Sequence, residues 1–363
     1  MLFTGGGTGG HVFPGVAVIE KLRKADPSLD IRWLGSSSRI EEEIIRRFDL
    51  SFIRIPSGKL RRYFSLLNLF DLFRIAAGLV ASFAVILRLR PALLFSKGGY
   101  VSVPPVIAAH LLKVPVVTHE SDLDPGLATR INARFAETIC VPYEESLSYF
   151  PEPYRAKIRV TGNPVREEIF GGDRSRGRVR FDLPEGVPLL LALGGSQGAR
   201  EINLLIEQAI ERLTERFFVV HQSGKKDFRE STVPRYVTAA FFADSYPDIL
   251  AAADLVIARS GAGTLWELAA QGKPSILIPL STAFSRGDQV RNAELFVRRG
   301  AAVTLPQADP GRLVEAAFSL VADRSRLRSM GEAARAIGRA DAAELIAGLI
   351  RKRIGAGNAA CPA

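Results

Sequence analysis

The stretch Met1–His11, MLFTGGGTGGH, decides the fold, and Leu189–Ala199, LLLALGGSQGA, repeats its pattern in the second half of the chain. In both, a short apolar run passes into a glycine-rich loop, and a helical pattern follows. A buried parallel strand that leads into a helix has this pattern. Glycines let backbone N–H groups approach an anion, and a helix N-terminus favours negative charge. Each half is therefore predicted to open with a strand–loop–helix unit suited to phosphate.

Outward from these two loops, short apolar runs alternate with amphipathic stretches, which is typical of parallel βα units. The strands expected in the first half are Met1–Thr4, Ile31–Leu34, Ala92–Ser96, Val114–His119, Thr138–Pro142 and Ile158–Thr161. Those expected in the second half are Leu189–Leu193, Phe217–Gln222, Leu255–Ala258, Ser275–Ile278 and Ala302–Thr304. A chain of 363 residues fits two such α/β domains. We expect them at 1–163 and 164–339, with a last helix near 340–356 that packs back on the first domain.

The formal net charge of +10 indicates an anionic partner, which could be nucleic acid, an acidic membrane or a phosphorylated substrate. Only two cysteines are present, Cys140 and Cys361, so neither a disulfide framework nor a cysteine metal site is expected. We expect no signal peptide, because Met1-Leu2-Phe3-Thr4 runs straight into glycines. The charge-free apolar run Ile75–Leu87 is shorter than the ~20 residues that a spanning helix needs. We expect a protein that can lie on a membrane without crossing it.

Three other readings of the glycine loops are weak. Gly5, Gly7 and Gly10 fit the dinucleotide spacing, but no acid follows at Leu34–Ser38, where the ribose would be held. No Lys-Ser or Lys-Thr follows the glycines, which excludes a Walker A loop. Gly194–Gly198 matches the hydrolase elbow G-x-S-x-G, yet only His221 follows it and no suitable acid lies between.

Asp122-Leu123-Asp124 matches the metal-binding D-x-D pattern of some glycosyltransferases. Pro125-Gly126 follows directly, so a turn is the better interpretation. We expect no metal and no cofactor.

Several strings together resemble the MurG family. They are GGGTGGHVFPG (5–15), KGGY (97–100), His119-Glu120, GNPVR (162–166), GGSQGAR (194–200), RSGAGTLWE (259–267) and QVRNA (289–293), and they stand in family order over nearly the whole chain. The resemblance implies the GT-B architecture, two Rossmann-like domains facing a cleft. It also implies an enzyme that transfers N-acetylglucosamine (GlcNAc) with inversion from UDP-GlcNAc to the C4 hydroxyl of N-acetylmuramic acid (MurNAc) in lipid I, giving lipid II for peptidoglycan.

The resemblance further implies which residues hold the donor. Glu267 should bond the ribose, Gln289 the sugar hydroxyls, and Ser196 with Arg166 the phosphates. Phe242 and Ala243 should meet the uracil. The remaining donor contacts fall on the loop Ala262, Gly263, Thr264 and Leu265, and across the cleft on Thr8, Gly9 and Gly10.

Two positions depart from the family pattern. Where the family usually has HEQN this chain has His119-Glu120-Ser121-Asp122, so a sugar contact normally made by Asn falls to Asp122. Asp288 likewise stands where Gln or His is usual. A carboxylate accepts hydrogen bonds but cannot donate them as an amide does.

The attacking hydroxyl needs a general base, and histidine has a suitable pKa of about 6.5. His11 ends the first glycine loop and is the predicted base, unless it binds acceptor phosphate instead. His119, on the acceptor side, is the second choice, although Glu120 beside it could order the loop. His110 and His221 are expected to be structural.

Basic and large apolar residues mix over Lys59–Arg74, including Lys59, Arg61, Arg62, Tyr63, Phe64 and Phe70. Such a segment can press into lipid headgroups while its cations meet anionic lipid. The predicted partners are UDP-GlcNAc, lipid I, the anionic cytoplasmic face of the inner membrane and proteins of cell-wall synthesis, with no nucleic acid. Two alternatives stay open, a GT-B transferase with another acceptor and a non-enzymatic nucleotide-sugar binder.

Overall fold

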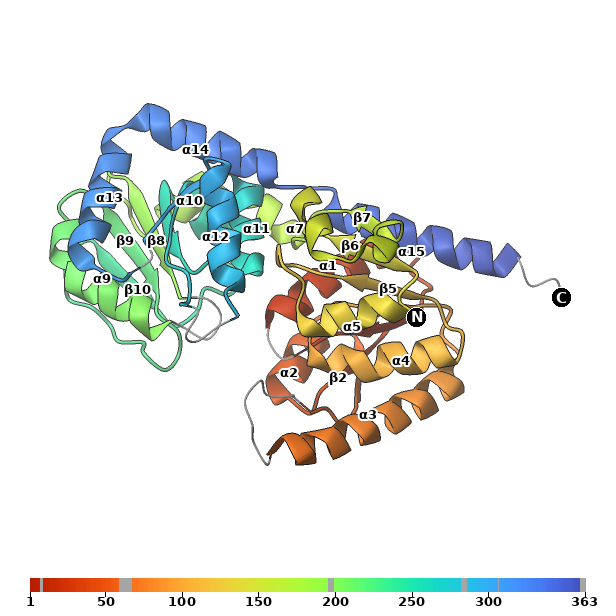
Figure 1. Ribbon diagram of the computed structural model, residues 1–363. Coiled ribbons are helices and arrows are strands. Elements are labelled where there is room, and N and C mark those ends of the chain that lie inside the picture. The colour runs from red at the N-terminus through yellow and green to blue at the C-terminus, as the bar shows by residue number, and fades with distance from the viewer. Residues whose placement is uncertain (7–8, 59–66, 195–198, 282–285, 306, 360–363) are drawn as a thin grey trace. The chain divides into compact units, whose positions relative to one another are not determined.

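A computed structural model describes residues 1–6, 9–58, 67–194, 199–281, 286–305 and 307–359 (Figure 1). The chain forms two compact units. Unit 1 comprises Met1–Arg166 and Asp341–Ala363, and unit 2 comprises Glu167–Ala340. Arg166 therefore belongs to unit 1, although the sequence analysis grouped it with the second domain.

Unit 1 is built on a parallel sheet of seven strands in the order β3-β2-β1-β4-β5-β6-β7. The strands are β1 (Leu2–Thr4), β2 (Arg32–Gly35), β3 (Ser51–Arg54), β4 (Leu94–Ser96), β5 (Val116–His119), β6 (Thr138–Val141) and β7 (Ile158–Val160). The helices are α1 (Gly9–Ala25), α2 (Arg39–Arg47), α3 (Leu67–Leu89), η1 (Tyr100–Ser102), α4 (Val103–Leu111), α5 (Leu127–Phe135), η2 (Glu144–Tyr149), α6 (Glu152–Arg155) and α15 (Ala342–Ala359). Strand order reverses between β1 and β4, and open α/β sheets bind ligands at the carboxyl ends of strands at such a switch point.

Both faces of this sheet are covered, because alternate strand residues pack into separate cores. On one face, Phe3 packs on Trp33 and Phe95 against α1 and α15. On the other face, Leu2 and Leu94 pack against helices that include α3 and α4. Helix α15 lies along α1 (Figure 1), so the end of the chain completes the first core.

Unit 2 contains a second parallel sheet, with six strands in the order β10-β9-β8-β11-β12-β13. The strands are β8 (Leu189–Leu193), β9 (Phe218–Gln222), β10 (Tyr236–Ala239), β11 (Leu255–Ala258), β12 (Ser275–Leu277) and β13 (Ala302–Thr304). The helices are α7 (Glu167–Phe170), α8 (Arg174–Val179), α9 (Arg200–Leu213), α10 (Tyr246–Ala252), α11 (Ala262–Gln271), α12 (Asp288–Arg298), α13 (Pro310–Ala322) and α14 (Arg324–Ile337). Its switch point lies between β8 and β11.

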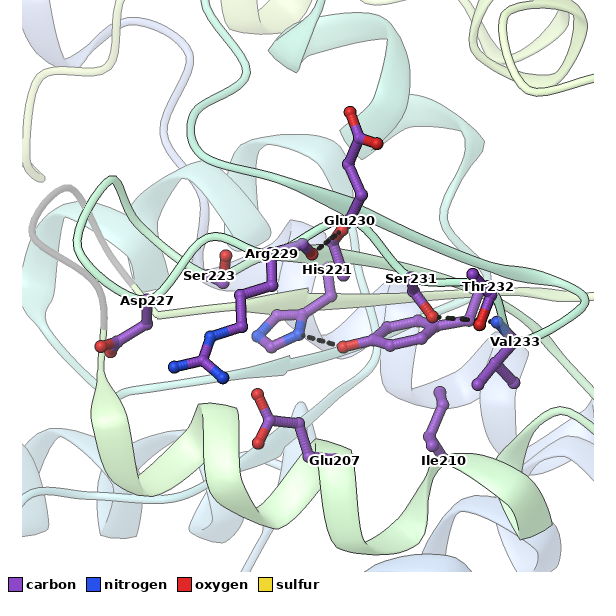
Figure 2. A pocket seen from close by; sticks show the side chains of 12 residues that line it. Glu207, Ile210, His221, Ser223, Asp227, Arg229, Glu230, Ser231, Thr232 and Val233 are labelled. Carbon is purple, nitrogen blue, oxygen red and sulfur yellow. Dashed lines mark hydrogen bonds between the residues drawn. The ribbon is translucent and has the colours of Figure 1, made fainter.

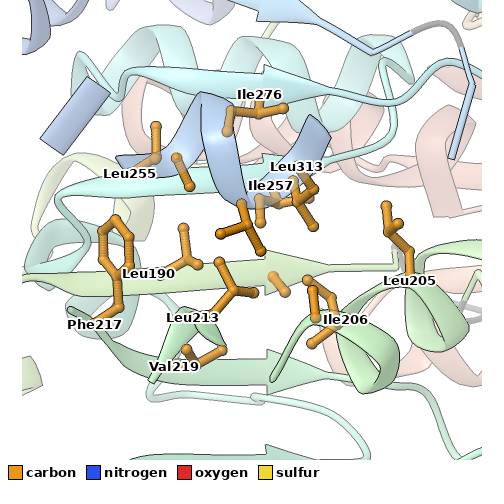
Figure 3. Close-up of a cluster of buried hydrophobic side chains, with 14 of the residues drawn as sticks. Leu190, Leu205, Ile206, Leu213, Phe217, Val219, Leu255, Ile257, Ile276 and Leu313 are labelled. Carbon is orange, nitrogen blue, oxygen red and sulfur yellow. The ribbon is translucent and has the colours of Figure 1, made fainter. Parts of the chain in front are cut away.

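The core of unit 2 is an aliphatic layer between the sheet and two helices. Figure 3 shows Leu190 and Ile257 on the strands, with Ile206 of α9 and Leu313 of α13 packed against them. All four side chains are fully buried. Such continuous apolar strands are what a sheet buried on both faces requires.

Helix α3 is apolar on both sides. Its buried side combines Ile86 with Gly78 and Ser82, and the Ser82 hydroxyl donates to the Gly78 carbonyl at 2.6 Å. Its open side is apolar, with Phe73 69% and Val80 71% exposed. The charge-free run in the sequence was judged too short to span a membrane. In the structure, the helical window Asp71–Leu89 has a mean hydropathy of 2.0, and 17% of it is buried. By length and composition alone, this window is long and apolar enough to cross a membrane.

Candidate active site

The clearest opening for an anion in unit 2 is the start of α11, at the carboxyl end of β11 beside the switch point. Ala262, Gly263 and Thr264 form the first turn of this helix, behind Gly261. A Cβ added at Gly261 or Gly263 would meet no atom within 4 Å. The first N–H groups of a helix have no partner within the helix, so they are available to a phosphate or sugar oxygen. This is the loop that the resemblance assigned to the phosphate–ribose side.

Glu267 lies one turn further along α11. Its Oε2 accepts a hydrogen bond of 2.9 Å from the Tyr246 hydroxyl of α10. The two residues before it are in the core, with Leu265 fully buried and Trp266 1% exposed. A donor contact by the Leu265 side chain is therefore excluded, and only its backbone can take part. A carboxylate fixed in this way is a suitable acceptor for ribose hydroxyls.

Gln289, at the start of α12, forms hydrogen bonds with the loops that follow β11 and β12. Its Oε1 accepts from the Leu280 N–H at 3.1 Å, and its carbonyl accepts from the Ser260 hydroxyl at 2.7 Å. Asn292 donates to the Ser260 carbonyl at 3.3 Å. Asp288, the other departure from the family pattern, pairs with Arg286 at 3.5 Å.

The segment assigned to uracil follows β10. The backbone N–H of Phe242 donates to the Gln222 side chain at 3.0 Å, and the Phe242 ring packs edge-on against Phe181 at 6.5 Å. Phe242 is 5% exposed. Its side chain is thus part of the core, so a base would meet the backbone around Phe242 and Ala243.

Part of the predicted site lies outside the described residues. Thr8, Ser196 and the basic segment Lys59, Arg61, Arg62, Tyr63 and Phe64 belong to that part. Gly9, Gly10 and His11 open α1, which places them at the carboxyl end of β1. The side chains of His11 and Phe70 are not described.

A group of buried polar residues, here called the Lys97 cluster, lies at the carboxyl ends of β4, β5 and β7 in unit 1. Its members are Lys97, His119, Glu120, Ser121 and Asn163. The Lys97 ammonium donates to the Ser121 hydroxyl, which donates to Asn163 Oδ1 at 2.6 Å. Lys97 is 1% exposed, and this burial lowers its pKa to about 8. Lys97 belongs to the KGGY string, but its sequence context predicted no role for it.

Glu120 orders the turn after β5, the role that the sequence analysis considered for it. Its two carboxylate oxygens accept from the N–H groups of Ser121, Asp122 and Gly126 at 2.8, 3.1 and 2.9 Å. In the same turn Asp124 pairs with Arg130 at 2.7 Å. The Asp122–Asp124 stretch is thus a folded turn, held by the Glu120 carboxylate and by the Asp124–Arg130 ion pair.

His119 is fully buried beneath this turn. Its Nε2 donates to the Gly162 carbonyl at 3.0 Å, since a carbonyl can only accept. Burial and the nearby Lys97 hold the pKa of His119 well below its usual value. The imidazole is therefore neutral and out of reach of a substrate in this structure, which weakens the prediction that His119 touches the acceptor or acts as base.

Two other predicted residues have local partners. The guanidinium of Arg166 lies over the Phe13 ring of α1, 4.5 Å from its centroid, so within unit 1 it packs near the start of α1. His221 borders a cavity of about 280 Å³ in unit 2 (Figure 2). Its Nδ1 accepts from the Tyr236 hydroxyl at 2.8 Å and its Nε2 donates to Asn203 Oδ1 at 3.0 Å. Both ring nitrogens are used in the fold, as expected for a structural histidine.

Comparisons with known proteins agree with this architecture. The glycosyltransferase family 28 N-terminal domain matches residues 1–141, and the family 28 C-terminal domain matches residues 189–346. A UDP-N-acetylglucosamine--N-acetylmuramyl-(pentapeptide) pyrophosphoryl-undecaprenol N-acetylglucosamine transferase of Treponema denticola is 41% identical over 97% of each chain. The protein of that name from Treponema pallidum is 46% identical over 85% of this chain and 83% of its own.

Solved structures show the same fold. Acinetobacter baumannii MurG superposes with a TM-score of 0.73 at 24% identity, covering 97% of this chain and 99% of its own. Staphylococcus aureus MnaA, solved with UDP, gives a TM-score of 0.72 at 15% identity over 98% and 96%. The two Rossmann-like sheets predicted from the sequence are thus confirmed as the GT-B architecture. The chain belongs to glycosyltransferase family 28 and, within it, to the MurG family that its motifs resemble.

Proposed function

We propose that the protein transfers GlcNAc from UDP-GlcNAc to the C4 hydroxyl of MurNAc in lipid I and so makes lipid II. The observation that carries the proposal is the match over 97% of both chains to a relative whose name states this transfer. The structure adds a pair of parallel sheets, each with a switch point suited to a ligand.

The donor would bind to unit 2. The open start of α11 offers backbone N–H groups to the diphosphate, and Glu267 offers a carboxylate to the ribose. When the sugar leaves, negative charge grows on the UDP phosphate. Oriented N–H groups at a helix N-terminus stabilise such charge because they need no rearrangement during the reaction. Ser196 and Arg166 remain predicted phosphate contacts, Gln289 a predicted sugar contact, and Ala243 with the Phe242 backbone the predicted uracil contact.

The acceptor would approach unit 1. His11, in the first turn of α1, is the proposed base that takes the proton of the attacking C4 hydroxyl. Attack from the face opposite UDP inverts the anomeric carbon, so the α-linked donor gives a β-1,4 product. Thr8, Gly9 and Gly10 keep their proposed place beside this reaction, and Asp122 its proposed sugar contact.

The open face of α3 supports attachment to a membrane surface. One side of α3 packs on α4 within unit 1, so lipid cannot surround the helix. The other side presents Phe73, Val80 and Leu87, each more than half exposed, with Arg74 and Arg88 also exposed. Apolar area beside cations suits a helix that lies in the interface of an anionic membrane. We place the protein at the cytoplasmic face of the inner membrane, where a lipid-linked acceptor is presented.

The test is the steady-state rate of UDP release with a short-chain lipid I analogue. His11→Ala should lower kcat by about 100-fold or more, because it removes the general base. Glu267→Ala should mainly raise the donor KM, because it removes a ribose contact.

Matched controls are His110→Ala and Glu211→Ala, which change exposed residues on α4 and α9. Both should keep wild-type kinetics. Full activity in His11→Ala would refute its role as base, and no turnover by folded wild-type protein would refute the proposed acceptor.

A further inference from the structure

A buried carboxylate that the proposed reaction does not yet use lies against the first glycine loop of unit 1. It belongs to Glu41, in the first turn of α2, which is 4% exposed. A Cβ added at Gly6 would lie 2.5 Å from the Glu41 Oε2, and a Cβ added at Gly35, the last residue of β2, would also meet this carboxylate. Gly6 and Gly35 therefore leave the space that the carboxylate occupies.

Three hydrogen bonds hold the Glu41 carboxylate in place. Its Oε1 accepts from the Trp33 indole N–H at 3.2 Å. Its Oε2 accepts from the Ser36 hydroxyl at 2.7 Å and from the Ser36 backbone N–H at 3.3 Å. A glutamate at this position usually turns back to the N-cap of its own helix. Glu41 instead reaches past the N-cap Ser38 to the end of β2, so its carboxylate is fixed beside the glycine loop.

Trp33 extends this arrangement to the loop and to α1. Its indole N–H also donates to the Gly5 carbonyl at 3.2 Å, and its side chain is fully buried. A Cβ added at Gly15 of α1 would lie 2.7 Å from the Trp33 ring, so α1 packs directly on this ring. The start of the loop and the helix that follows it are therefore both in contact with the Trp33–Glu41 pair.

The position of this loop matters to the proposed reaction, because α1 carries the proposed base. Gly9, Gly10 and His11 open this helix. A misplacement of about 1 Å in a reacting group can lower a rate by about 100-fold. A change that moves the loop at Gly6 or tilts α1 on Trp33 would displace this first turn.

We propose that Glu41 is a positioning residue for sugar transfer, whose buried carboxylate fixes the first glycine loop and, through Trp33, the start of α1. The inference rests on the proposed function, because the reaction supplies its readout. It assigns Glu41 no contact with substrate, since the side chain is buried. Its effect is confined to unit 1, so the proposed UDP site on unit 2 does not depend on it.

The experiment is a double-mutant cycle on GlcNAc transfer with Gly6→Ala, Glu41→Ala and the double variant. Gly6 does not have a positive φ, so alanine suits its backbone, and the three atoms nearest to an added Cβ all belong to Glu41. Each single substitution should lower kcat by about 100-fold, because each displaces the loop. In the double variant the added methyl group occupies space that the carboxylate has left. Its kcat should therefore equal that of Glu41→Ala within about threefold.

Glu42→Ala is the matched control. Glu42 is the next residue of α2, and its carboxylate pairs with Arg46 at 2.9 Å and with Arg54. Its substitution removes ion pairs from the same helix and leaves the Trp33–Glu41 pair intact. Its kcat should stay within about twofold of wild type at a temperature where the protein is folded.

Binding of UDP supplies a second readout, which separates lost positioning from lost structure. The nucleotide is proposed to bind unit 2, so its Kd, measured by calorimetry, should stay within about twofold of wild type in every variant. If Glu41→Ala does not fold, Glu41→Gln decides in its place. The amide keeps the shape of the side chain, but its nitrogen cannot accept a hydrogen bond as the replaced oxygen does. Its kcat should fall by about 10-fold with the Kd for UDP unchanged.

Wild-type kcat in folded Glu41→Ala or Glu41→Gln would overturn the inference. Full additivity of the two single effects in the double variant, an equal loss of kcat in Glu42→Ala, or weakened UDP binding in the Glu41 variants would overturn it as well. None of these results would touch the proposed function, which fails only if wild-type protein transfers no GlcNAc to lipid I.

Discussion

At the scale of single residues, burial decides which histidines can work as bases. His119 and His221 are fully buried, and both have a pKa below the usual value because the charged form would lose its water. In each, the Nε2–H group donates a hydrogen bond within the fold, to the Gly162 carbonyl from His119 and to Asn203 Oδ1 from His221. Of the other two histidines, His110 is exposed on α4, and His11 lies in a first helical turn at a strand end, so His11 stays the candidate.

The buried His221 makes unit 2 sensitive to acid. Burial lowers its pKa to about 4, whereas the unfolded value is about 6.5. The unfolded state therefore binds a proton first as pH falls, and stability is lost from about pH 6.5 down to about 4. Between pH 7 and pH 5 this site should cost about 2 kcal/mol of unfolding free energy.

Urea unfolding of wild type and His221→Asn at the two pH values measures this loss. The variant should be less stable at pH 7 and should lose about 2 kcal/mol less than wild type on acidification. An equal loss in both proteins would show that His221 does not set the acid dependence. His119 adds a loss of the same sign, so some slope should remain in the variant.

The roles of buried charges were the part of the site least visible in the sequence. Glu120 was recognised as a loop-ordering candidate because it follows a strand directly. Lys97 received no role, because a lysine next to two glycines gives no sign that its ammonium is buried. Its partner Ser121 is 24 positions away, and Asn163, the partner of Ser121, is a further 42 positions along the chain. These residues become neighbours only when parallel strands align their carboxyl ends.

At the scale of elements, α3 exposes large apolar side chains on one side, while Ile86 on its other side packs in the core of unit 1. Phe73 and Val80 are about as exposed as a charged surface residue would be. Exposed apolar area of this extent marks an interaction site. The lipid-linked acceptor makes a membrane surface the proposed partner.

Val80→Ser should therefore weaken binding to liposomes that contain anionic lipid, and Val80→Ser with Phe73→Ser should weaken it further. Each buried apolar side chain adds about 1.5–3 kcal/mol, so the pair should reduce binding by at least 10-fold. Val179→Ser is the matched control, since Val179 of α8 is 79% exposed and lies in unit 2. Flotation or sedimentation with vesicles gives the result, and equal binding by all three variants would contradict a role for α3.

Substitutions at two helical glycines test how closely α3 packs on the segment beside it. A Cβ at Gly78 would lie 2.3 Å from the Pro56 carbonyl oxygen, whereas a Cβ at Gly348 of α15 would meet nothing within 4 Å. Gly78→Ala should thus destabilise the protein by about 1–3 kcal/mol, because α3 must move away. Gly348→Ala should be neutral or stabilising by up to about 1 kcal/mol, because alanine favours the helix.

Thermal or urea unfolding of the two variants measures this contrast. Equal stability of both would mean that α3 does not pack closely on the segment that contains Pro56.

The strands show what sequence pattern can and cannot predict. Every strand expected from an apolar run is present within two residues of its predicted ends. The two strands that were missed, β3 and β10, are edge strands at equivalent places in the two sheets. The residues of β3 are half-buried or exposed, so the segment lacks the continuous apolar run of a central strand. The same holds for most of β10.

At the scale of the whole molecule, the chain ends on the unit where it began. Helix α15 contributes Ile346, Ala347 and Ile350 to the core that contains Val16 of α1. Unit 1 is therefore discontinuous in sequence and unit 2 is inserted between its parts. The last helix was expected to pack back on the first domain, and it does so; that its partner there is α1, more than 300 positions away, is seen only in the structure.

The central claim is that the accepting group is the C4 hydroxyl of lipid I. The most direct measurement incubates wild-type protein with radiolabelled UDP-GlcNAc and a lipid I analogue, and in parallel with the same analogue lacking the C4 hydroxyl. The account predicts label in a β-1,4-linked disaccharide lipid from the first acceptor and none from the second. Label in the deoxy analogue, or transfer to a diacylglycerol in place of lipid I, would contradict it.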